Sequence, residues 1–171
     1  VLFRSYRLIF SPIQSSGVYS LTVGIGVRDP AGNALNQNNN TINGEAGDAF
    51  SGGFSFPVFW TNWTSGTNGG NGSATGTLNV NGEIVTVNYA GEVAFIQTNG
   101  GTNYWNPSSP YVSSSVPNAP PAADIIALSL SSQKTLTFSR PITNPLFAVV
   151  SLNGNGYRFD RDFQILSYGA G

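Results

Sequence analysis

The sequence contains no histidine, no cysteine and no methionine, and its single lysine is Lys134. Without histidine, the chain cannot form a Ser-His-Asp catalytic triad, and without cysteine it cannot form a Cys-His catalytic pair. The same absences exclude a disulfide and a zinc site built from these residues. A Ser-Lys dyad would require Lys134, which stands in an expected turn and is interpreted as a solvated charge. We therefore expect that the protein is not an enzyme.

Charged residues are also scarce, at 9% of the chain, and the net charge is −1. A nucleic-acid partner is not expected, because phosphate binding requires a basic face. No apolar run approaches the length of a membrane span, so we expect no span in this chain. Asparagine, serine, threonine and glycine must then supply the polar surface, a composition typical of exported bacterial proteins. The expected location is extracellular, at the cell surface.

Proline and glycine interrupt the chain throughout, and no apolar window has a helical period with caps at its ends. Runs rich in Phe, Val, Ile and Tyr alternate with Pro, Asn and Gly, as in successive antiparallel strands. The pattern predicts an all-β fold, an antiparallel β-sandwich of jelly-roll or immunoglobulin-like type, with no significant helix. Residues 136–166 predict three such strands, with residues 146–152 covered on both faces and residues 157–165 wet on one side.

A hairpin is predicted over residues 77–89, with Asn81-Gly82 as a two-residue turn and Leu78 opposite Val85. The residues before it, 65–76, are rich in Gly, Asn, Ser and Thr and are expected to form an exposed loop.

Two domains are expected: an N-terminal β segment over residues 1–50 and a β-sandwich domain over residues 51–171. The first contains two expected strands, residues 6–10 and 18–27. An immunoglobulin-like sandwich needs about seven strands and about 100 residues, so this segment cannot close one alone. It must pair with the following domain, with an upstream half, or with another copy of the chain. The side chains expected to take part in such assembly are Leu2, Tyr6, Leu8 and Phe10.

The sequence leaves open whether its two ends are native or artificial. The opening VLFRS is what translation of a common sequencing adapter gives, which would indicate a truncated metagenomic reading frame. The alternative is an ordinary opening strand.

Between the N-terminal strands and the second domain, residues 28–48 are expected to form a polar loop, in which Asn36, Asn38 and Asn40 stand at every second position. Oxygen ligands at alternate positions are how loops wrap Ca²⁺, although Thr41 and Gly47 depart from the EF-hand pattern. Ca²⁺ is thus the one cofactor considered, and the alternative is a loop of Asx turns. The candidate ligands are Asp29, Asn36, Asn38, Asn40, Glu45 and Asp48.

Aromatic side chains in or beside expected loops predict a second kind of site, because flat rings stack on sugar faces. The candidates for polysaccharide binding are Trp63, Tyr104, Trp105 and Tyr111. The alternative is that these rings belong to the core. A carboxylate pair, Asp160 and Asp162, has the alternation that a glycosidase could use, but a surface ion-pair ladder with the neighbouring arginines is favoured.

Residues 11–50 resemble the final strands of bacterial immunoglobulin-like modules, in which a GxYxLxV strand leads into a D-x-AGN-x-L-x-Q loop. The matching residues are Gly17, Tyr19, Leu21, Val23, Asp29, Ala31, Gly32, Asn33, Leu35 and Gln37. Residues 63–168 resemble exported bacterial proteins that carry PEP-CTERM or choice-of-anchor sorting signals. That match rests on the segments GSATGT at 72–77, GTNYW at 101–105, DIIAL at 124–128, TLTFS at 135–139 and 157–163. It implies a secreted β-sandwich at the cell surface and no catalytic residues.

Two functions are consistent with these features. The first is a non-catalytic structural protein, a subunit or module of a bacterial fibre, surface layer or adhesin that assembles through β-strand donation. Its partners would be copies of itself or neighbouring modules of the same surface protein. The second is a carbohydrate-binding module that uses exposed Trp and Tyr rings.

Overall fold

The computed structural model describes residues 9, 11, 13 and 15–169 of the chain, which are organised as short β-strands in antiparallel pairs. The strands are β1 (Gly17–Val23), β2 (Phe50–Phe56), β3 (Asn62–Thr67), β4 (Gly69–Val80), β5 (Glu83–Val93), β6 (Phe95–Gln97), β7 (Ile125–Ala127) and β8 (Thr135–Phe138). Two single 3-10 turns, η1 (Ala46–Asp48) and η2 (Ser109–Tyr111), complete the regular structure. The all-β, antiparallel prediction is confirmed.

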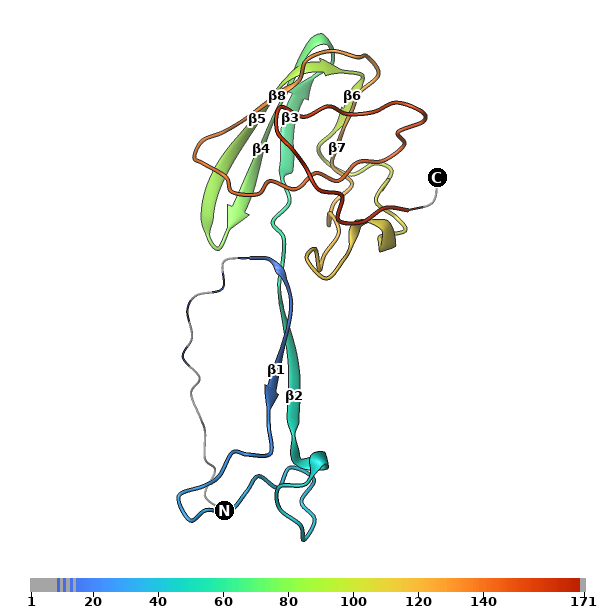
Figure 1. Ribbon diagram of the computed structural model, residues 1–171. Helices are drawn as coiled ribbons and strands as arrows, with labels where there is room; N and C mark the ends of the chain where they lie inside the picture. The colour runs from blue at the N-terminus through green and yellow to red at the C-terminus, as the bar shows by residue number, and fades with distance from the viewer. Residues whose placement is uncertain (1–8, 10, 12, 14, 170–171) are drawn as a thin grey trace.

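The strands form three separate sheets: β1-β2, β3-β4-β5-β8 and β6-β7. They do not close into a barrel among the described residues, and the jelly-roll or immunoglobulin-like sandwich stays a prediction. Figure 1 shows the β1-β2 pair extending away from the four-stranded sheet, with the loop that joins the two strands at its far end. No helix in the described part of the chain is long and apolar enough to cross a membrane.

The four-stranded sheet contains the core, and its central hairpin is the one predicted from sequence. Leu78 pairs with Val85, and both turn residues, Asn81 and Gly82, have positive φ, as a primed two-residue turn requires. Buried side chains alternate along β4 and β5, and Trp63 packs against both of the clusters they form. The cluster members are Ala74, Tyr89 and Val93 in one and Leu78, Val85 and Val87 in the other.

The exposed loop expected at residues 65–76 is wrong, because these residues belong to β3 and β4. Gly72, Ala74 and Gly76 are buried at alternate positions, so the inward face of β4 is built from the smallest side chains. Those small residues leave room for the ring of Trp63 and the side chain of Val93. A composition that is typical of loops therefore encodes a close-packed strand.

The three strands expected in residues 136–166 are also wrong in part. β8 forms where predicted, but residues 146–152 and 157–165 form no strand, and Phe147 is 49% exposed. A strand requires a partner, and among the described residues nothing pairs with the outer edge of β8. Asn144, Ser151 and Asn153 have positive φ, which interrupts any extended run.

The strand expected at residues 18–27 is shorter than predicted, because β1 ends at Val23. β1 pairs along its whole length with β2, from Gly17 opposite Phe56 to Val23 opposite Phe50. Of the three pairings considered for the N-terminal segment, the structure contains the one with the residues that follow it. The expected strand at 6–10 and the assembly residues Leu2, Tyr6, Leu8 and Phe10 lie outside the described residues.

Candidate functional site

The β1-β2 pair, here called the ribbon, has two chemically different faces. Directly opposed residues of antiparallel strands point to the same side, so the register assigns every side chain to a face. One face, the apolar ribbon face, consists of Tyr19, Leu21, Val23, Phe50, Phe54 and Phe56. The other face consists of Val18, Ser20, Thr22, Ser51, Gly53 and Ser55. The ribbon is therefore amphipathic.

The apolar ribbon face is exposed although its rings contact one another. Tyr19 stacks on Phe54 with ring centroids 5.6 Å apart, and Phe56 packs edge-on against both rings. Phe54 nevertheless keeps 40% and Phe56 42% of its surface exposed. Rings that pack against neighbours on the same face of a two-stranded sheet bury part of their surface and leave the rest in water.

The outer edges of the ribbon are open. Beyond the ladder between β1 and β2, the backbone hydrogen bond recorded for these strands within the described residues runs from Val18 N to Ser114 O, at 3.0 Å. Among the described residues, the remaining outward N–H and C=O groups of the two strands have no backbone partner and can pair with a further strand.

The ribbon is held to the rest of the protein at its base by residues 113–118. Ser16 Oγ donates to Ser115 O at 3.0 Å. Asn118 accepts from Val58 N at 2.7 Å and donates to Val58 O at 2.9 Å, so its side chain pairs with the backbone just after β2. Trp60 Nε1 donates to Asn118 O at 3.0 Å. These contacts fix the direction in which the ribbon leaves the sheet.

Replacing Asn118 with alanine is expected to loosen this base. Both polar groups of Val58 lose their partner, which costs about 1 to 3 kcal/mol where such groups are shielded from water. Hydrogen exchange should accelerate at residues 57–60 while the β4-β5 hairpin keeps its protection. Asn79→Ala is the matched control, because Asn79 accepts from Gly82 N in an exposed turn far from the ribbon. Equal protection at residues 57–60 in both variants would show that Asn118 does not hold the base.

The loop at the far end of the ribbon is organised by Asp48, which is fully buried. Its Oδ1 accepts from the backbone N–H of Gln37 and Asn38, and its Oδ2 accepts from those of Gly44 and Glu45. Burial alone would raise the pKa of Asp48, but these four backbone donors outweigh it and lower the pKa below the usual aspartate value. Asp48 therefore acts as an ionised anchor for the loop.

The other candidate Ca²⁺ ligands of this loop are linked by their amide nitrogens. Asn38 Nδ2 donates to Glu45 Oε1 at 2.7 Å, and Asn40 Nδ2 donates to the same oxygen. Asn36 Nδ2 donates to Asn40 O and to Asn43 Oδ1, while Asn36 Oδ1 is buried without a partner.

Asp29 belongs to a tight turn of its own, where its carboxylate accepts from Ala31 N, Asn33 N and Asn33 Nδ2. The structure thus brings Asn36, Asn38, Asn40, Glu45 and Asp48 into one network, but with N–H groups directed at the carboxylates. Within the described residues, no group of three or more acidic side chains could hold a metal ion.

The four candidate sugar-binding rings do not form one exposed platform. Trp105 is only 7% exposed, donates from Nε1 to Asp124 O and packs edge-on against Tyr111 at 5.3 Å. Trp63 is half-buried against the core, and its backbone N–H donates to Asp124 Oδ2. Tyr104 alone is well exposed, at 39%, beside Phe95.

A buried charged cluster at the end of β5 was not predicted from sequence. Glu92 is 3% exposed; it accepts from Ser129 N, Ser129 Oγ and Leu130 N, and it lies 3.9 Å from Lys134 Nζ. Lys134 also donates to Leu130 O and to Ser132, so it is not the freely solvated charge expected from its turn. The nearby Tyr89 donates to Glu92 O, and burial, followed by the charge of Glu92, raises the pKa of Tyr89 to about 12.

This cluster fastens the segment before β8 to the end of β5. No alternation or motif in the sequence marks Glu92, which lies in β5 one residue before the strand ends. All the groups involved have partners, so the cluster is structural and offers no free nucleophile.

The chain was compared with known proteins at the level of family models, curated sequences and solved structures. No family model, no curated protein and no solved structure matches it. Both resemblances noted in the sequence therefore remain predictions.

Proposed function

We propose that the chain is a non-catalytic structural protein of the bacterial cell exterior, a subunit or module of a fibre, surface layer or adhesin. It assembles by β-strand donation, and the ribbon is the element through which it does so. The observation that supports this most directly is an amphipathic two-stranded sheet with an exposed apolar face and open edges.

Two strands with one apolar face are marginal alone in water and gain stability when a third strand or a second layer is added. An added strand satisfies a row of backbone groups at once, and the side chains beside it fix the register. The Phe side chains of the apolar ribbon face are about 40% exposed, so each one that becomes fully buried contributes about 1 kcal/mol. A neighbouring copy or module that covers the face would therefore add several such contributions to the backbone pairing.

The proposed location follows from composition and from the resemblance to exported, anchored proteins. A surface with 9% charged residues and abundant Asn, Ser and Thr allows close packing between copies with little charge repulsion. The jelly-roll or immunoglobulin-like sandwich belongs to the same proposal, with the four-stranded sheet as one of its layers.

The test is a double substitution on the apolar ribbon face, Phe54→Asp with Phe56→Asp. The unaltered protein is expected to associate with rising concentration in sedimentation velocity and to give filaments or sheets in negative-stain images. The double variant is expected to remain monomeric, because two carboxylates on the face would have to be dehydrated on contact.

Ser51→Asp with Ser55→Asp is the matched control, because it adds the same two charges to the same strand on the opposite face. It should leave assembly unchanged. A wild-type protein that stays monomeric at all concentrations, or a double variant that assembles normally, would contradict the proposal.

A further inference from the structure

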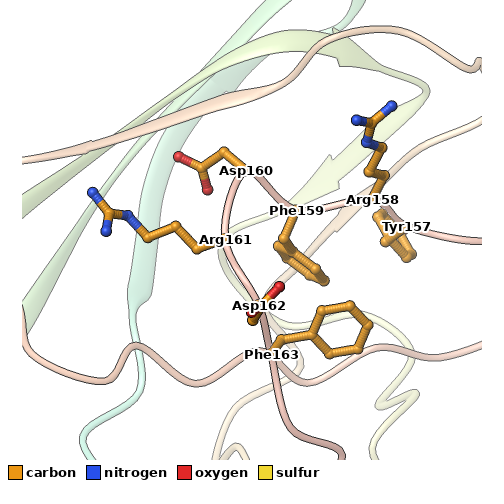
Figure 2. Close-up of a pocket in the computed structure, with 7 residues that line it drawn as sticks. All are labelled: Tyr157, Arg158, Phe159, Asp160, Arg161, Asp162 and Phe163. Atoms are coloured by element: carbon orange, nitrogen blue, oxygen red, sulfur yellow. The ribbon is translucent and has the colours of Figure 1, made fainter.

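The C-terminal segment contains an open groove that neither the strand pattern nor the assembly proposal uses. It is formed by residues 157–163, where the chain bends without regular structure, and its volume is about 580 Å³. Its walls combine three aromatic rings with two arginines and two aspartates. Figure 2 shows the rings of Tyr157, Phe159 and Phe163 gathered on one side of the bend.

Phe159 holds the rings together. Its ring lies 5.1 Å from that of Phe163 and 5.2 Å from that of Phe147, and it is nearly parallel to that of Tyr157, with 27° between the planes. Phe159 is half-buried, whereas Tyr157 is 44% and Phe163 is 63% exposed. The outer two rings are thus positioned by contacts behind them and present free faces to solvent.

The groove has two arginines and two aspartates, so its charges sum to zero. Arg158, Asp160, Arg161 and Asp162 alternate in sequence, yet none of the four forms an ion pair within the described residues. The ion-pair ladder expected from sequence is therefore wrong, because the strand that would align these side chains does not form. Their donors and acceptors remain free for a ligand.

This chemistry restricts the ligand. An anion would face the two aspartates, a cation would face the two arginines, and a wholly apolar partner would have to strip water from four charges. A neutral sugar has C–H faces that stack on rings and hydroxyls that both donate and accept hydrogen bonds. We propose that the groove binds a neutral polysaccharide, with Tyr157 and Phe163 stacking on sugar rings and the flanking Arg158 and Asp162 bonding to hydroxyls.

The test is affinity electrophoresis in native gels that contain dextran, galactomannan, xyloglucan or mixed-linkage β-glucan, with alginate and pectate as anionic probes. The protein is expected to be retarded by at least one neutral polymer. Phe163→Ala and Tyr157→Ala should each weaken that retardation about tenfold, because the stacking contact is lost; tenfold corresponds to about 1.4 kcal/mol. Circular dichroism of both variants verifies that the fold is retained.

Tyr168→Ala is the matched control, because it removes an exposed ring outside the groove and should leave binding unchanged. Asp160→Asn combined with Asp162→Asn gives the groove a net positive charge and should add binding to alginate and pectate. The Phe54→Asp, Phe56→Asp variant should bind the neutral polymer as the unaltered protein does, which separates this inference from the assembly proposal. Retardation by none of the neutral polymers, or loss of it in Tyr168→Ala but not in Phe163→Ala, would overturn the inference.

Discussion

Replacing Glu92 with glutamine is expected to lower the free energy of unfolding by about 3 kcal/mol, the largest effect of any single side-chain change proposed for this chain. The amide nitrogen of glutamine would meet donors from Ser129 or Leu130, and Lys134 would lose the one carboxylate with which it pairs among the described residues. Urea unfolding followed by tryptophan fluorescence measures the change. Glu83→Gln is the control: Glu83 pairs with Arg140 at an exposed site, so its loss should cost at most about 0.5 kcal/mol.

The same carboxylate makes stability depend on pH in the acid range. Burial alone would raise the pKa of Glu92, but hydrogen bonds from Ser129 and Leu130 and the charge of Lys134 lower it below the ordinary glutamate value of 4.5. The carboxylate of Glu92 therefore binds a proton less readily in the folded state than in the unfolded chain. The ionised Glu92 therefore stabilises the folded state fully above about pH 5, and this stabilisation is lost as the pH falls through the pKa that Glu92 has in the folded state.

The melting temperature should therefore be steady from pH 8 to about pH 5 and should fall below that. Asp48, whose pKa is also lowered, contributes in the same direction. Glu92→Gln should have a shallower fall than the unaltered protein. Identical acid limbs in the two proteins would contradict the role given to Glu92.

Replacing Gly76 with alanine is expected to destabilise the four-stranded sheet by about 2 to 3 kcal/mol, as overpacking of a filled core does. A Cβ at this position would lie 2.7 Å from the backbone oxygen of Asn62, 2.7 Å from Cγ2 of Thr61 and 2.9 Å from Cε3 of Trp63. The contact with backbone oxygen cannot be relieved by a side-chain rotation, so β3 must move away from β4.

Gly70→Ala is the control, since the same strand has open space around that residue. Thermal unfolding should give a clearly lower melting temperature for Gly76→Ala than for Gly70→Ala. The near-ultraviolet circular dichroism signal to which Trp63 contributes should change only in Gly76→Ala. Equal stabilities would show that the inward face of β4 is not close-packed.

What could be predicted from sequence was local pairing. The Asn81-Gly82 turn between alternating runs has essentially one solution, so the register of β4 and β5 followed directly. The absence of helix followed in the same way from the spacing of proline and glycine. For the candidate site, the pattern also indicated that β1 could not stand alone, because two strands with one apolar face require something beyond them.

The local composition predicted the wrong structure for segments whose conformation depends on residues distant in sequence. Residues 65–76 look like a loop, and only Trp63 and Val93 across the sheet explain why Gly72 and Gly76 form a strand. Residues 157–165 have the alternation of a strand, but they pair with no strand of the described part of the chain and form an open bend lined by rings and charges instead.

The sequence by itself therefore determined that the chain is all-β and antiparallel and which hairpin forms the centre of its main sheet. It also determined that the chain has no histidine or cysteine with which to catalyse a reaction. Only the tertiary structure decided that β1 pairs with β2, that Trp105 is buried while Phe163 is exposed, and that Glu92 is buried with Lys134 beside it. The physical reason is that backbone geometry and turn chemistry act over a few residues. Burial and strand pairing instead depend on surfaces that meet only when distant segments are brought together.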